Sequence, residues 1–298
     1  MPEVRERVVE SGPARLFVRD VGEGRPLVVV HGGPDFDHRY LLPELDRLAP
    51  LCRLVYYDQR GRGRSILGEV AADVTVRSEV EDLDVIRRAL ELGSIVVLGH
   101  SWGALVALEY ALAFPAAVSH LILISPAPAS PDDAAGLRDC LRDSRSIEQR
   151  DRMAALAASP AFRAGDVEAD AAYYRIHFAA ALRRPELVDE VVARLRRGFS
   201  DAGIVAARAI EEHLYEQTWR SLDWELLTRL GQLRIPTLII HGDADLIPLD
   251  VARHIADAIP DARLEVLGDC GHFAYLEQPA PTYRAVAGFL GPAGSDQV

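Results

Sequence analysis

The stretch VVLGHSWGALVALEYAL, residues 97–113, decides how the rest of the chain is interpreted. It starts as a buried strand, passes through Gly99-His100-Ser101-Trp102-Gly103, and continues with apolar residues at helical spacing. A serine between two glycines at a strand-to-helix turn is typical of a nucleophile held on a strained turn. The glycines let the helix pack closely on the sheet, and the first N–H groups of that helix favour a developing oxyanion. The alternative is a plain turn in which Ser101 has no chemical role.

The segments on either side of this stretch alternate between strand-like and helix-like patterns, which predicts a mostly parallel α/β sheet. Strands are predicted over 15–21, 26–33, 52–61, 94–100, 120–128, 235–245 and 262–272, and helices over 76–93, 103–114, 249–260 and 282–290. Between about 130 and 230 the helical period dominates. The sequence therefore predicts a catalytic domain formed by 1–128 and 231–298, interrupted by a helical cap at 129–230.

Composition excludes several classes of protein. The 298 residues carry a formal net charge of −12, which would repel a phosphate backbone, so nucleic acid is not expected as a partner. No apolar run reaches the roughly 18 residues that a membrane span needs, and no secretory signal is visible at the N-terminus. The three cysteines form no CxxC pair, which is typical of a reducing compartment. We therefore predict a cytoplasmic protein without membrane attachment.

A serine hydroxyl needs a base and an acid that orients the base, and in this fold class they follow in the order Ser, Asp or Glu, His. The strand-like segment LIIHGDAD ends with Asp243 and Asp245, and the next strand-like segment is followed by His272. Asp245 is the preferred acid because it lies three residues after Gly242, and Asp243 and Asp269 are its competitors. The alternatives are a turn-forming or helix-capping aspartate and a structural histidine.

An oxyanion hole requires the N–H of the residue after the nucleophile and one from the loop after an early strand. Trp102 follows Ser101, and the segment VVVHGGPDF (28–36) places two glycines directly after a strand. We predict Gly33 as the second donor, with Gly32 beside it in contact with substrate. His31 is interpreted as holding this loop by hydrogen bonds rather than as a catalytic group.

Five motifs in this order make the chain similar to the α/β-hydrolase superfamily and, within it, to the proline iminopeptidase family. They are HGGPD (31–35), YYDQRGRGRS (56–65), GHSWGA (99–104), HGDAD (241–245) and GHFAYLEQP (271–279). The resemblance implies an α/β-hydrolase fold, with a mostly parallel, doubly wound eight-stranded sheet and a helical cap inserted after the sixth strand. It also implies Ser101 as nucleophile, Asp245 as acid, His272 as base, and Gly33 and Trp102 as oxyanion donors.

The cap departs from the family pattern. The family usually has HGGPG, whereas this chain has Asp35 in the fifth position. Family members bind the free amine of the substrate through cap glutamates, one of them in a Trp-Glu pair and another in an ENHY-like stretch. The segment AIEEHLYEQ (209–217) is similar to the second and points to Glu211 or Glu212, but no Trp-Glu pair precedes it. The alternative for both glutamates is a solvated helix face.

These observations predict a serine hydrolase that works through an acyl-enzyme and removes an N-terminal residue from a small peptide. A carboxylesterase or lactonase with the same three residues is the first alternative, and a non-catalytic ligand-binding protein of this fold is the second. Tyr174 and His177 in the cap are expected either to line the substrate site or to pack the cap on the core. No cofactor or metal is expected, and the partner is a small-molecule or short-peptide substrate.

Overall fold

The computed structural model describes residues 3–66, 73–221 and 223–291. Its strands form one eight-stranded sheet with the order β1-β2-β4-β3-β5-β6-β7-β8. The strands are β1 Val4–Ser11, β2 Ala14–Val21, β3 Pro26–Val30, β4 Arg53–Tyr57, β5 Ile95–His100, β6 Val118–Ile124, β7 Thr237–Gly242 and β8 Ala262–Leu267. Strand β2 pairs antiparallel with β1 and β4, and the pairs from β4 through β3 to β8 are parallel. The predicted fold class is confirmed.

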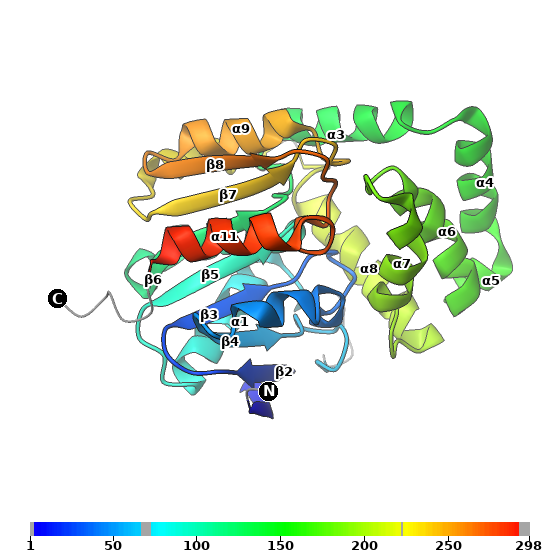
Figure 1. Ribbon diagram of the computed structural model, residues 1–298. Coiled ribbons are helices and arrows are strands. Elements are labelled where there is room, and N and C mark those ends of the chain that lie inside the picture. The colour runs from blue at the N-terminus through cyan, green and yellow to red at the C-terminus, as the bar shows by residue number, and fades with distance from the viewer. Residues whose placement is uncertain (1–2, 67–72, 222, 292–298) are drawn as a thin grey trace.

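Several helices before β6 and after the segment of α-helices between β6 and β7 cover this sheet. They are α1 Val76–Ala89, α2 Trp102–Ala113, α9 Leu249–Ala258, α10 Ala274–Glu277 and α11 Pro279–Leu290, with 3-10 helices η1 His38–Leu41, η2 Glu44–Leu48, η4 Pro115–Ala117 and η6 Leu227–Gln232. Helix α2 contacts α1 and the strands β3, β5 and β6, and α9 contacts β7 and β8. Helix α11 crosses in front of the sheet in Figure 1 and contacts β7. The interior strands β5 and β7 are buried along their whole length, as is typical of apolar runs in parallel sheets.

Between β6 and β7 the described residues form helices and no strand. These helices are α3 Pro131–Asp143, α4 Ile147–Ala158, α5 Pro160–Arg163, α6 Val167–Ala179, η5 Pro185–Leu187, α7 Val188–Leu195 and α8 Asp201–Gln217, followed by η6. In Figure 1, α3 runs from the edge of the sheet toward α4, and the helices α4 to α7 lie together beside the sheet. The cap boundaries at 129 and 230 stay a prediction, and the second of them falls inside η6.

The sequence patterns did not predict β1. Its residues VRERVVES are charged at several positions, and six of the eight are exposed. An edge strand that faces water on most of its surface carries no apolar run and only a weak alternation.

The topology brings distant residues to one edge of the sheet. The loops after β3, β5, β7 and β8 carry Gly33, Ser101, Asp245 and His272. Because these four strands are parallel, their carboxyl ends lie at the same edge, where ligands bind in open α/β sheets. Among the described helices, none has the length and apolar character needed to cross a bilayer.

Candidate active site

Ser101 occupies a strained turn between β5 and α2. Its backbone has φ 55° and ψ −120°, a conformation that is uncommon for a residue with a side chain. Close packing enforces it, since a Cβ on Gly99 would lie 2.6 Å from the backbone N of Ala104, and one on Gly103 would lie 2.6 Å from the carbonyl oxygen of His31. The backbone N–H of Ser101 donates to the carbonyl of Ile124 at 3.0 Å. The turn is therefore fixed by the sheet on one side and the helix on the other.

Asp245 and His272 meet beside this turn. Nδ1 of His272 lies 2.8 Å from Oδ1 of Asp245, and the same oxygen accepts the N–H of Ile247 at 2.9 Å. Burial alone raises the pKa of a carboxyl group, but the charges of His272 and His241 and the hydrogen bond from His272 bring the pKa of Asp245 well below its usual range. Because Asp245 stays ionised, the proton lies on Nδ1 of His272, which leaves the lone pair on Nε2.

The two competing aspartates lie elsewhere. Asp243 accepts the backbone N–H of Cys270 at 3.1 Å, and exposed Asp269 pairs with Arg183 at 2.8 Å. Of the three aspartates, Asp245 is the one whose carboxylate bonds to the ring of His272.

Ser101 and His272 line the same cavity, which has a volume of about 510 Å³. Among the described residues, no hydrogen bond joins the Ser101 hydroxyl to the His272 ring. Such contacts are often long in proteins without substrate and shorten when the substrate binds.

Two backbone N–H groups border the serine. Trp102 is the first residue of α2, so its N–H has no partner within the helix. Gly33 lines the cavity with φ +127°, and a side chain there would strike the backbone of Asp35. The N–H of Gly32, in contrast, donates to the Tyr40 hydroxyl at 2.7 Å. Gly33 and Trp102 as the oxyanion donors therefore stay a prediction.

A chain of buried hydrogen bonds connects the Gly32 loop to His272. The Tyr40 hydroxyl accepts from Gly32, so its own proton goes to Nδ1 of His100, 2.7 Å away. Nε2 of His100 then donates to the backbone carbonyl of His272 at 3.1 Å. Burial lowers the pKa of His100 to about 3, so the ring stays neutral and this arrangement is the only one its nitrogens allow.

The two cap glutamates lie in different surroundings. Glu211 on α8 lines the cavity, is half-buried, and accepts the Tyr215 hydroxyl at 2.8 Å. Burial, with the nearby charge of Asp35, raises the pKa of Glu211 to about 8. Glu212 is exposed at the cavity rim and pairs with Arg220 at 3.1 Å. A solvated helix face therefore describes the surroundings of Glu212 and not those of Glu211.

Tyr174 and His177, both on α6, line the cavity and also hold the cap together. The Tyr174 hydroxyl donates to Oδ2 of Asp35 at 2.8 Å, which joins cap to core. Nδ1 of His177 accepts from Arg145 at 3.0 Å, and burial together with the charge of Arg145 lowers the pKa of His177 to about 3. Tyr174 therefore lines the cavity and joins the cap to the core, whereas His177 lines the cavity and bonds to Arg145 within the cap.

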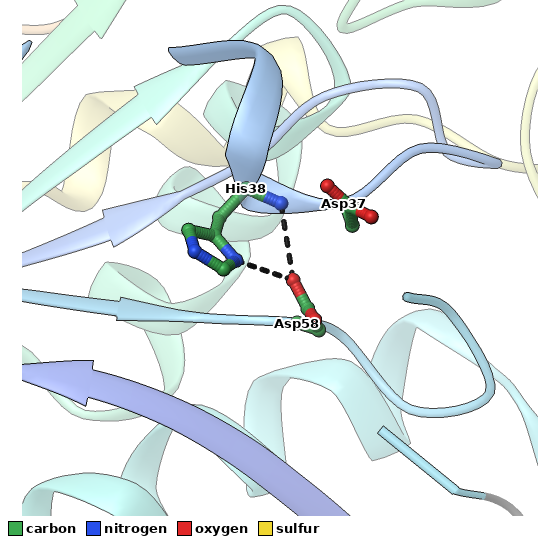
Figure 2. Close-up of side chains that lie close together, drawn as sticks. All are labelled: Asp37, His38 and Asp58. Carbon is green, nitrogen blue, oxygen red and sulfur yellow. Dashed lines mark hydrogen bonds and ion pairs between the residues drawn. The ribbon is translucent and has the colours of Figure 1, made fainter. Parts of the chain in front are cut away.

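A buried cluster joins Asp37 and His38, from the segment after β3, to Asp58, which directly follows β4 (Figure 2). Each residue offers an atom that could ligate a metal, and these atoms lie within 4.8 Å of one another. Asp58 already accepts the His38 ring at 2.6 Å and the backbone N–H groups of His38 and Arg64 at 3.1 and 2.8 Å. Asp37 accepts the backbone and side chain of Arg39. Hydrogen bonds within the protein thus occupy these carboxylates, and the cluster serves to fix the loop.

Residues 25–279 match the family model of the alpha/beta hydrolase fold. The chain belongs to the α/β-hydrolase fold family. A proline iminopeptidase from Lactobacillus crispatus (strain ST1) is 30% identical to this α/β hydrolase over 271 residues, which cover 88% of this chain and 89% of the relative. A proline iminopeptidase from Lactobacillus delbrueckii subsp. bulgaricus is 28% identical over 298 residues, or 97% and 99% of the two chains.

A solved structure agrees with these relatives. The proline iminopeptidase-related protein from Thermus thermophilus is 28% identical to this α/β hydrolase, with a TM-score of 0.73 and coverage of 98% and 99%. The resemblance inferred from the motifs is confirmed, and the protein is a proline iminopeptidase-like hydrolase.

Sequence reasoning missed several residues that shape the site of this α/β hydrolase. Asp35 stood out only as a departure from the family pattern, yet it is fully buried and contacts Tyr174 and Arg196 in the cap. Arg196 is 161 positions away along the chain. A pair so distant has no local pattern, and only the substitution in the HGGPG motif could have pointed to it.

Proposed function

We propose that this hydrolase cleaves amide bonds through an acyl-enzyme and releases the N-terminal residue of small peptides. Nε2 of His272 takes the proton of the Ser101 hydroxyl, which attacks the carbonyl carbon. Asp245 holds the tautomer of His272 and stabilises its charged form. The N–H groups of Gly33 and Trp102 stabilise the oxyanion. His272 then protonates the leaving amine and activates the water that hydrolyses the acyl-enzyme.

The observation that carries the chemistry is the 2.8 Å bond between Nδ1 of His272 and Oδ1 of Asp245 in the cavity that Ser101 also lines. It leaves the second nitrogen of the imidazole free to act as a base. No step requires a metal or an organic cofactor.

Glu211 supports a substrate with a free amine. Its carboxyl group lies in a cavity with many aromatic and aliphatic side chains, and among the described residues no arginine or lysine pairs with it. A carboxyl group in such surroundings binds a cation more favourably than a neutral ligand. The relatives named proline iminopeptidase support a prolyl residue at this position.

The test compares four substrates: prolyl nitroanilide, alanyl nitroanilide, N-blocked prolyl nitroanilide and nitrophenyl butyrate. We expect cleavage of the free-amine substrates and loss on blocking the amine, with Ser101→Ala lowering every rate by orders of magnitude. Ester cleavage without amide cleavage would favour a carboxylesterase or lactonase instead. Full activity of the purified Ser101→Ala variant would contradict the proposed chemistry, and absence of all activity would favour a ligand-binding protein.

A further inference from the structure

Of the two carboxylate oxygens of Asp35, one accepts hydrogen bonds and the other accepts none from the described residues. Its side chain is completely buried and borders the cavity. Oδ2 accepts from Arg196 at 2.6 Å and from Tyr174 at 2.8 Å, whereas Oδ1 makes no hydrogen bond among the described residues. A buried acceptor without a partner is unfavourable, so its presence beside a ligand cavity indicates a donor that arrives with the ligand.

The loop places Asp35 close to Gly33, and both residues line the cavity. Asp35 follows Gly33 by two residues, so their Cα atoms lie within about 7 Å of each other. Gly33 is the proposed oxyanion donor. A cation bound by Asp35 would therefore lie beside the carbonyl under attack, as the α-amino group of the acyl residue does. A basic group at the end of a long side chain would lie farther away.

A second carboxyl group borders the same cavity from the cap. Oε1 of Glu211 accepts the Tyr215 hydroxyl, and Oε2 makes no hydrogen bond among the described residues. The two groups influence each other, since the charge of Asp35 contributes to the raised pKa of Glu211. Two acceptors, one from the core and one from the cap, match the two N–H groups of a protonated pyrrolidine nitrogen.

The ion pairs around Asp35 form a network that does not include Glu211, so a bound cation can still pair with that residue. Arg196 pairs with Asp170 as well as with Asp35, and Asp170 pairs in turn with Arg208. These two acids and two arginines balance one another. Glu211 lies outside the network and is the cavity carboxyl group whose charge a bound ammonium would neutralise.

We propose that Asp35 is a specificity-determining residue whose carboxylate, together with Glu211, binds the protonated α-amino group of the substrate. This inference rests on the proposed function. It gives the core loop that carries the oxyanion donor a second task, which is to select substrates with a free amine.

The test uses two small ligands that differ in one ring atom. L-Prolinol carries the basic nitrogen, and tetrahydrofurfuryl alcohol has oxygen in its place. Both are measured as inhibitors of nitrophenyl butyrate hydrolysis, and the ratio of their inhibition constants reports the amine preference. Because both constants come from one enzyme preparation, the ratio is independent of the fraction of folded enzyme.

We expect Asp35→Asn to reduce the preference for prolinol by roughly tenfold to a hundredfold, the effect of losing a hydrogen bond to a charged group. Asp170→Asn is the matched control, because it breaks the same ion-pair network without removing a cavity carboxylate, and it should keep the preference. If Asp35→Asn is insoluble, Asp35→Gly takes its place, since Arg196 keeps Asp170 as its partner.

An unchanged preference in the Asp35 variant, or an equal loss in Asp170→Asn, overturns the proposal. A wild-type enzyme that prefers prolinol through Asp35 but cleaves no aminoacyl nitroanilide would support the amine site and reject the proposed function. A wild-type enzyme without any preference for prolinol would reject the amine site whether or not it cleaves amides.

Discussion

The raised pKa of Glu211 makes the use of amine substrates dependent on pH in a way that can be calculated. With a pKa of about 8, Glu211 is ionised in about half of the molecules at pH 8, about one tenth at pH 7 and about one hundredth at pH 6. An ammonium group binds to the ionised form, so acidification removes the binding-competent state. The expected sign is therefore a loss of amine substrate binding as pH falls below 8.

The assay divides kcat/KM for prolyl nitroanilide by kcat/KM for nitrophenyl butyrate at each pH. Both reactions use the same serine and histidine, so the contribution of these two residues cancels in the ratio. We expect the ratio to rise about eightfold from pH 6 to 7 and about threefold from pH 7 to 8, because Glu211 becomes ionised while the α-amino group of the substrate, with a pKa of about 8, begins to lose its proton. Above about pH 8 the α-amino group of the substrate loses its proton, and the ratio should fall again.

Two variants test whether Glu211, rather than another titrating group, causes the rise of this ratio with pH. Glu211→Gln has no carboxyl group to ionise, so the rise should disappear. Asp35→Asn removes a negative charge that helps to raise the pKa of Glu211, so any remaining rise should move to lower pH. A ratio that is constant between pH 6 and 8, or a rise of the same size in Glu211→Gln, would refute this reasoning.

Three further substitutions test the surroundings of the serine. Asp245→Asn should lower kcat for nitrophenyl butyrate by roughly 10³–10⁴-fold, because His272 loses the acceptor that fixes its tautomer. Tyr40→Phe leaves the N–H of Gly32 and Nδ1 of His100 without partners, so we expect about 1–3 kcal/mol lower unfolding free energy in urea titrations, along with a lower kcat. Gly103→Ala pushes a methyl group against the carbonyl groups that end β3, and circular dichroism should show an unfolded or insoluble chain; a folded, active variant would mean that α2 can move away from the sheet.

The sequence could predict the residues at the strand ends because their positions follow from local patterns. Ser101, Asp245 and His272 each follow a strand, and parallel strands bring their carboxyl ends to one edge. The strand order alone therefore predicts that His272 and Asp245, which form a hydrogen bond in the structure, lie close together. The ends of elements were less accurate: the strand predicted to end at 272 stops at Leu267, where the turn through Gly268 and Asp269 begins.

The interior of the cap could not be predicted in the same way. Helical spacing indicated a set of helices, but it did not show that Glu211 faces the cavity while its neighbour Glu212 pairs with Arg220 at the rim. Adjacent helical residues differ by about 100° in direction, so the choice depends on how α8 is rotated against the core. That rotation depends on contacts between distant segments, such as the hydrogen bond from Gln217 at the end of α8 to the carbonyl of Val74.

The cap is also part of the machinery that positions His272. The backbone N–H of His272 donates to the carbonyl of Ala181 in the cap at 2.7 Å. Glu277 in α10 accepts the N–H groups of Gly271 and Arg183, at 3.0 and 2.7 Å, and so clamps the cap turn to the histidine loop. A cap that swung away as a rigid lid would break these bonds and displace His272.

Changes of substrate must therefore be accommodated by other parts of the cap. The turn at 181–184 is tied to the histidine loop, whereas the cavity faces of α6 and α8 contact the ligand space without holding the backbone of His272. Substitutions on those two faces can alter the acyl group that fits while the serine, histidine and aspartate keep their geometry. Because one fold can host different functions through changes in its sites, we expect the specificity of this hydrolase to depend on the contacts between the HGGPD loop, α6 and α8.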